Sequence, residues 1–157
     1  SLELGALTLT EKHLRGDPPS IAELMKLEKN IQNHLKIATI PTQYKLLGIA
    51  GTVSTIATLV KKNDRFTSSS INGMNLTLKK LEEIKKILVC ANLKERSQML
   101  KADPKRAEII IAGVMILICL MKKNSRKSLM VSTYGLRHGL CIDVATKLKL
   151  LDMSWKN

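Results

Sequence analysis

The residues best suited to chemistry begin with a glycine-containing turn near the middle of the chain. An apolar stretch at 44–50, typical of a buried strand, leads directly into Gly51, Thr52, Val53 and Ser54, where a helix is predicted to start. Gly51 permits close approach of the backbone, and the hydroxyls of Thr52 and Ser54 add donors. Unpaired N–H groups and the positive end of the helix dipole would face an anion there. This turn is a candidate phosphate site.

A second turn of the same design lies near the end of the chain. The strand predicted at 128–132 ends at Ser132, and Gly135 and Arg137 open the following helix, where Arg137 could reach a phosphate with two N–H groups. Each turn alone is ambiguous, since a Gly-Thr turn is more often a plain helix cap and an arginine near a helix start is usually a surface residue. Because open α/β sheets bind ligands at the carboxyl edge of their strands, the two turns together favour one shared phosphate site.

The net charge of the chain agrees with an anionic ligand. Lysine and arginine number 26 against 13 acidic residues, which gives a formal charge of +13. That balance favours a polyanion, although a lysine-rich solvated surface explains the charge equally well. Lysine pairs such as Lys61-Lys62 are spread along helices rather than gathered in one run, which argues against a nucleic-acid-binding tail.

Catalytic residues and metal ligands are not evident in the sequence. Hydrolysis of a phosphate ester needs carboxylates that position water or hold a metal ion. The acidic residues fall on predicted helix faces or caps without the spacing of a dyad, and the three histidines show no ligand spacing. Neither a Walker-type phosphate loop nor a dinucleotide fingerprint occurs. The sequence thus predicts a place for phosphate, with no catalytic residue and no metal ligand in this chain.

The elements that must position these turns alternate along the chain. We predict, in order, strand 2–10, helix 21–37, strand 44–50, helix 53–60, strand 71–76, helix 77–88, helical turns 93–99, helix 103–121, strand 128–132 and helix 137–150. The stretch 107–121 is apolar on nearly every face, so that helix should be buried on all sides. Strands that alternate with helices predict an α/β fold with an at least partly parallel sheet.

The cysteines and the hydropathy of the chain indicate the cellular compartment in which the protein is expected. Cys90, Cys119 and Cys141 form no C-x-x-C pair and each sits in an apolar stretch, so we expect free core thiols in a reducing compartment. The longest apolar run, 109–121, is about a third short of the ~20 residues of a membrane-spanning helix, and no leader is evident. We expect a cytoplasmic protein with no membrane partner.

Five motifs occur in a fixed order along the chain: SLELGA at 1–6 with LTE at 9–11, GIAGT at 48–52, INGMNL at 71–76, DPKRA at 103–107 with IIAG at 110–113, and STYGLR at 132–137. Their order and spacing resemble the exopolyphosphatase / guanosine pentaphosphate phosphohydrolase family of the actin-like superfamily. The resemblance implies the second half of an actin-like (ribonuclease H-like) α/β fold, with a mixed sheet flanked by helices. Residues 1–150 would form most of a C-terminal domain whose first strands are missing, and 151–157 a tail.

The resemblance also implies a function. Such enzymes release terminal phosphate from inorganic polyphosphate or from the guanosine nucleotide pppGpp, an alarmone of the stringent response, usually with Mg²⁺. Their substrate lies in a cleft between two actin-like domains. The turn at Gly51 and Thr52 resembles the superfamily's nucleotide-side loop, and 132–137 resembles its second connecting motif. The catalytic glutamate, the metal-associated acid and a glycine-rich loop lie upstream of the matching segment in this family.

The resemblance also implies partners, whereas the net charge of +13 supports an alternative function. The Mg²⁺ ligands should lie outside this chain, the fragment should be inactive alone, and its partners should be a missing N-terminal domain and, in a possible homodimer, a second copy. The chain departs from the family at His138, where glutamate is usual, and at Asn72, where histidine is frequent. The alternative function is a non-catalytic basic module that binds polyanions or nucleic acid.

Overall fold

The core is organised around one helix, α7, whose surroundings are described below.

The structure is a computed structural model that describes residues 2–62 and 67–148, so the predicted tail at 151–157 lies outside the described residues. The elements, in chain order, are α1 (Ala6–His13), α2 (Ile21–Leu35), β1 (Leu47–Gly48), α3 (Gly51–Val60), α4 (Ser68–Ile71), β2 (Asn75–Thr77), α5 (Leu78–Cys90), α6 (Leu93–Met99), the 3-10 turn η1 (Pro104–Arg106), α7 (Ile110–Lys123), β3 (Ser128–Val131) and α8 (Leu136–Lys147).

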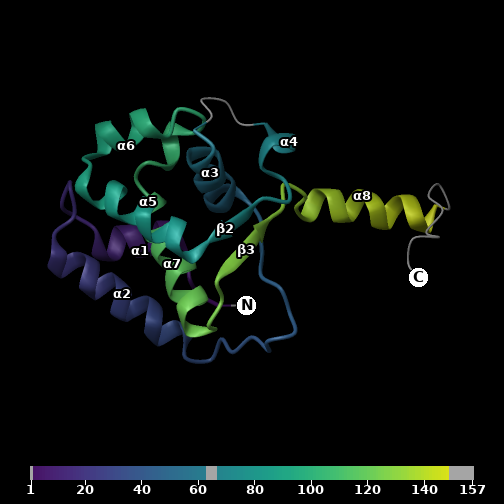
Figure 1. The fold of residues 1–157 in the computed structure, drawn as a ribbon, viewed down its shortest axis with the longest axis horizontal. Coiled ribbons are helices and arrows are strands. Elements are labelled where there is room, and N and C mark those ends of the chain that lie inside the picture. Colours follow the sequence, from purple (N-terminus) through teal and green to yellow (C-terminus); the bar gives the residue numbers. More distant parts are fainter. Residues whose placement is uncertain (1, 63–66, 149–157) are drawn as a thin grey trace.

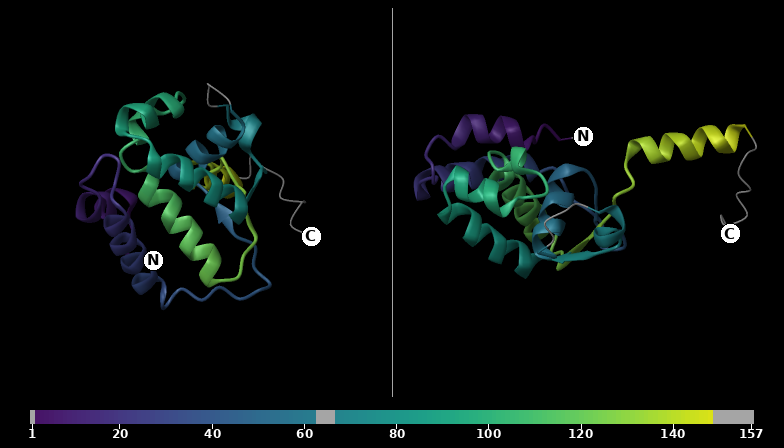
Figure 2. Two further views of the ribbon diagram at one scale, coloured as in Figure 1. Left: turned by 60° about the vertical axis from the view of Figure 1, so that its left-hand side comes forward. Right: turned by 90° about the horizontal axis from the view of Figure 1, so that it is seen from above.

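Helix α7 is enclosed as its sequence predicts. It contacts α1, α2, α3 and α5, and most of its residues, from Ile110 to Met121, are buried. Figures 1 and 2 show α7 between α2 and α5, with the sheet at one end of this cluster and α8 projecting away from it. None of the residues of α8 is buried.

The sheet is small and mixed. Its strand order is β1-β3-β2, with β1 parallel to β3 and β2 antiparallel to it. Leu129 and Val131 of β3 are buried in the core, whereas Leu47 and Met130 are exposed. Successive side chains of a strand point to opposite faces, so the helices cover one face of the sheet and leave the other bare.

Three sequence predictions about these elements are wrong in whole or in part. Residues 6–13 form helix α1 rather than part of a strand, because burial of Leu9 against the α2–α7 cluster overrides the alternating leucines. The strand predicted at 71–76 is correct only at Asn75 and Leu76, which belong to β2, whereas Ile71 is the last residue of the short helix α4. The motif at Asp103 opens η1, and α7 begins only at Ile110.

The cysteine prediction is partly wrong. All three cysteines are free, but only Cys119 is buried, whereas Cys90 and Cys141 are exposed on α5 and α8. Burial raises the pKa of the Cys119 thiol to about 11, so this thiol stays protonated at neutral pH.

Helix starts follow the predicted capping chemistry, most clearly at α2. Ser20 caps the helix in a capping box with Glu23. The carboxylate of Glu23 accepts hydrogen bonds from the backbone N–H of Ser20 at 2.7 Å, of Gly16 at 2.9 Å and of Arg15 at 2.8 Å. These bonds lower the pKa of Glu23 to about 2. One side chain thus joins the α1–α2 loop to the first turn of α2.

Replacing Glu23 with glutamine should destabilise the protein at neutral pH, because the amide accepts these hydrogen bonds less strongly than the carboxylate. The pKa of Glu23 is about 2 in the folded chain against an ordinary 4.5, so its stabilising effect is complete above the ordinary value and is lost as the pH falls toward about 2. The difference in melting temperature between wild type and Glu23→Gln should therefore shrink on acidification.

Glu83→Gln is the matched control, since Glu83 only pairs with Lys80 on the exposed side of α5. Its melting temperature should stay close to that of the wild type at every pH. An equal effect of Glu23→Gln at about pH 7 and about pH 3 would contradict the role assigned to the carboxylate.

Candidate phosphate site

Pairing of β1 with β3 brings the ends of the two predicted turns to one edge of the sheet. The strands run parallel, with Gly48 opposite Val131, and Ser132 N donates to Gly48 O at 2.8 Å. The chain leaves β1 for α3 and β3 for α8 at this edge. The predicted juxtaposition of the two strand ends is therefore present.

The first turn has the features of an anion-binding helix start. Helix α3 begins at Gly51 and its first residue is not capped by a side chain, so its first N–H groups are available to a ligand. Ala50, just before it, has φ 69° and ψ −174°. That backbone conformation is almost confined to glycine and costs an alanine about 1–3 kcal/mol. The strained backbone conformation thus belongs to Ala50. The glycine at position 51 is required for a different reason.

Gly51 makes room for an arginine that the sequence analysis did not single out. A β-carbon at Gly51 would overlap the guanidinium of Arg106. Asp103 holds this guanidinium through a hydrogen bond from Arg106 Nε to Asp103 Oδ2 at 2.8 Å. The Arg106 side chain is 33% exposed, so its charge remains accessible to solvent. Arg106 lies in the DPKRA motif, but only the folded chain shows that it covers the start of α3.

A cavity of about 310 Å³ opens beside this arrangement, lined by Ala50, Gly51, Ser54, Thr55, Thr58, Ala102 and Asp103. The cavity contains the predicted site residues Gly51 and Ser54. The other two predicted residues of this turn are used in packing. Val53 is buried, and the side chain of Thr52 lies against Gly113 of α7, where a β-carbon would collide with it.

The second turn is held by its own polar contacts. Tyr134 N donates to Ser132 Oγ at 3.1 Å, and Thr133 N donates to Asn72 Oδ1 at 3.0 Å. At the start of α8, Gly135 N donates to His138 Nδ1 at 3.3 Å. His138 thus accepts the hydrogen bond that a glutamate at the same helical position accepts in a capping box. Both departures from the family pattern, Asn72 and His138, have structural partners here.

The two turns line different hollows. Ser132, Gly135 and Arg137 border a hollow of about 830 Å³ together with Leu47, Tyr134, His138, Gly139, Cys141 and Ile142. It shares no lining residue with the cavity at Gly51. The structure therefore places the strand ends side by side, but Arg137 borders a different hollow from the cavity beside Gly51. Among the described residues, no single hollow is lined by both turns.

Comparison with known proteins identifies the family. The model of the Ppx/GppA phosphatase family matches residues 1–148. The chain belongs to the Ppx/GppA phosphatase family. Exopolyphosphatase 2 of Mycobacterium tuberculosis is 24% identical over 153 residues, which cover 92% of this chain and 48% of that protein. The chain thus spans about half the length of this Ppx/GppA relative.

Solved Ppx/GppA structures have the same fold. Two crystal structures of the Aquifex aeolicus Ppx/GppA protein match with TM-scores of 0.86 and 0.88 at 25% identity, covering 90% and 94% of this chain and 47% and 48% of theirs. An exopolyphosphatase from Cytophaga hutchinsonii matches with a TM-score of 0.76 at 21% identity, over 92% of this chain and 48% of that one. The predicted fold class, part of an actin-like α/β domain, is confirmed.

Two further features concern metals and membranes. Within 2–62 and 67–148, no group of three or more histidine, cysteine, aspartate or glutamate side chains could hold a metal ion. No helix in these ranges is long and apolar enough to cross a membrane.

The roles given to Ala50 and Gly51 predict opposite effects on stability. Ala50→Gly should raise the free energy of unfolding by about 1 kcal/mol, because glycine adopts this backbone conformation without strain but loses more chain entropy. Gly51→Ala should lower it by about 1–3 kcal/mol, because the β-carbon displaces Arg106. Urea unfolding of both variants measures the two effects, and a loss of stability in Ala50→Gly would contradict the assignment of strain.

Proposed function

We propose that this chain is the phosphate-binding half of a phosphohydrolase that removes terminal phosphate from inorganic polyphosphate or from pppGpp. Membership of the Ppx/GppA family and similarity to an exopolyphosphatase support the reaction class. The observation that carries the proposal is the guanidinium of Arg106 held by Asp103 above the uncapped start of α3.

This arrangement suits a phosphate group for two physical reasons. A guanidinium forms paired, charge-assisted hydrogen bonds with phosphate oxygens, and a helix start adds N–H donors and a favourable dipole. Asp103 takes the Nε donor of Arg106 and so orients the side chain without further movement. Ser54 adds a hydroxyl at the cavity wall. Asp103 is therefore a positioning residue, and Arg106 is the residue that we expect to contact phosphate.

The remaining parts of the active site would come from the half of the relatives' length that this chain does not span. We propose that this half supplies the catalytic carboxylates and the ligands of a Mg²⁺ ion. It would also cover the bare face of the sheet and the apolar residues of α8, where Leu136, Leu140 and Val144 are 87%, 60% and 46% exposed. Apolar residues exposed in this number on one element mark an interaction surface. Docking there would place Arg137 opposite the partner half.

A non-catalytic module that binds polyanions remains the second candidate, because the charge of +13 favours it. Salt separates the two functions. Diffuse electrostatic binding weakens with salt for every polyanion alike, whereas a site built around Arg106 should prefer triphosphate-bearing ligands over DNA of equal charge. Competition between GTP and single-stranded DNA at two salt concentrations provides this comparison.

Removing the guanidinium should weaken binding of GTP or tripolyphosphate about tenfold, which corresponds to the loss of one hydrogen bond to a charged group. Arg106→Ala tests the contact, and Asp103→Asn, which keeps the shape but loses the charge, should give a smaller loss. Arg15→Ala is the matched control, since Arg15 is an exposed arginine that does not line this cavity. Isothermal titration calorimetry gives the affinities, and equal losses for Arg106→Ala and Arg15→Ala would contradict a specific site.

The chain alone should release no phosphate from polyphosphate in the presence of Mg²⁺, because its described residues contain no group of three or more histidine, cysteine, aspartate or glutamate side chains that could hold the metal ion. A malachite-green assay beside a full-length family member measures this. Phosphate release at a rate comparable to that of the full-length enzyme would contradict the division of roles between the two halves.

A further inference from the structure

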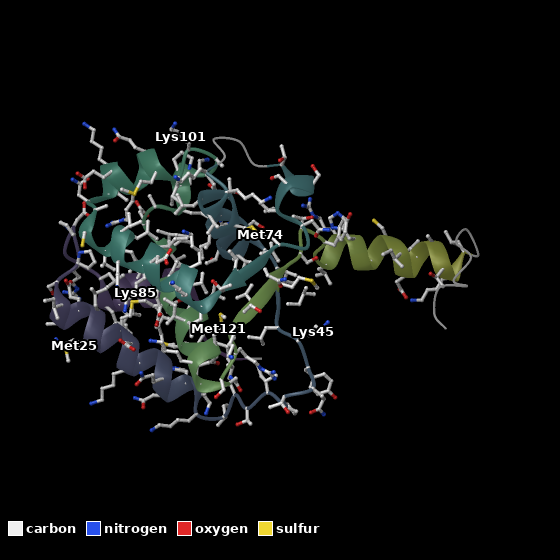
Figure 3. The ribbon with its side chains drawn as sticks, viewed as in Figure 1. Met25, Lys45, Met74, Lys85, Lys101 and Met121 are labelled. Carbon is white, nitrogen blue, oxygen red and sulfur yellow. The ribbon has the colours of Figure 1, made fainter. Side chains whose placement is uncertain are left out.

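A second hollow lies at the opposite edge of the sheet, where β1 and β3 begin. Its volume is about 470 Å³, larger than that of the cavity beside Gly51. The loop before β1 forms one wall and the turn between α7 and β3 the other; the lining residues are Thr42, Tyr44, Lys45, Leu46, Asn75, Ser125, Arg126, Lys127, Ser128 and Met130. Figure 3 shows Lys45 on this loop, beside the sheet. The candidate phosphate site beside Gly51 includes none of these residues.

The two walls are fixed to each other by long-range hydrogen bonds. Arg126 donates to the carbonyl oxygens of Thr42 at 2.9 Å and of Ile40 at 3.2 Å, and also to that of Pro41. Asn124 Oδ1 accepts from Ile40 N at 2.8 Å. These contacts join segments about eighty residues apart in the chain, so the hollow is formed before any ligand binds.

The charge of the hollow has one sign. Lys45, Arg126 and Lys127 are in its wall, and no aspartate or glutamate is among the lining residues. Among the residues that the structure describes, the hydrogen-bond partners of Arg126 are backbone carbonyls, and no carboxylate there neutralises its charge. Within the described ranges neither Lys45 nor Lys127 forms an ion pair. Coulomb repulsion among these cations is relieved by an anion between them.

Neutral donors complete the wall. The same hollow is also lined by residues that carry a hydroxyl or amide group, namely Thr42, Tyr44, Ser125, Ser128 and Asn75. Hydroxyl and amide groups beside two or three cations match an oxyanion that carries several acceptor oxygens and more than one charge. The volume lies within the range of small-molecule sites.

From this combination we propose that the hollow is a second anion site, which binds a compact polyvalent oxyanion of the phosphate class. It lies at the amino ends of β1 and β3, whereas the candidate phosphate site lies at their carboxyl ends. The proposal stands without the proposed function, because it uses neither Arg106 nor the start of α3.

Binding of tripolyphosphate to the intact chain tests the proposal. The double variant Lys45→Gln/Lys127→Gln should bind about tenfold more weakly at low salt, because two of the three cations are removed. Lys29→Gln/Lys94→Gln makes the same change in net charge at two exposed lysines on other helices and should bind like the wild type. In NMR titrations, tripolyphosphate should shift the amide signals of 42–46 and 125–128 in the wild type and not in the first double variant.

Three results would overturn the second site. The first is equal weakening of binding in both double variants, because this would indicate diffuse electrostatic attraction. The second is unchanged affinity in Lys45→Gln/Lys127→Gln. The third is that the signal shifts are confined to the start of α3. Arg106→Ala separates this proposal from the proposed function, since shifts at 42–46 and 125–128 should persist in that variant. Parallel titrations with GTP distinguish the source of the phosphate: equal shifts indicate that the phosphate chain alone is bound, and larger shifts with GTP indicate a nucleotide site.

Discussion

Burial of α7 on all sides is the constraint on which the rest of the structure depends. A helix with no polar face must be covered all round, and here α1, α2, α3 and α5 cover it. Gly113 lets Thr52 approach α7, which fixes where α3 begins. The turn that precedes α7 carries Arg106, so the same helix also determines where the guanidinium lies. The geometry of the candidate phosphate site is thus a result of core packing.

A buried arginine, Arg96, holds the segments on either side of α6 and η1 in place. Arg96, only 5% exposed, donates to the carbonyl oxygens of Ala107 and Ala91 and to the carboxylate of Asp17. The same carboxylate accepts from Leu93 N at 2.8 Å. These bonds tie α6 to the loop before α2 and to the residue after η1. The buried charge of Arg96 is tolerated because its N–H donors have hydrogen-bond partners. The same hydrogen bonds restrain the segment that carries Arg106.

The sequence was most informative where local chemistry decides the structure. The apolar helix at α7 and the caps Ser20 and Thr77 follow from residue type and spacing, and β1 and β3 lie within the predicted strands. The strand expected at 2–10 failed because tertiary burial of Leu9 decides between a helical and an alternating pattern. The contact of Arg106 with Gly51 joins residues far apart in sequence, so periodicity carries no sign of it. For the same reason, the sequence could not show that the two turns line separate hollows.

The lack of buried residues in α8 has a consequence for how the chain assembles. A helix of 12 residues with a glycine at position 139 is short and interrupted enough that its intrinsic helix–coil equilibrium in water is close to balanced. Helix α8 would then fold mostly when the two halves associate, and part of the free energy gained from their contact would offset the cost of ordering the helix. The affinity between the halves would be lowered accordingly, while the geometry of their junction, including Arg137, would be set only on assembly.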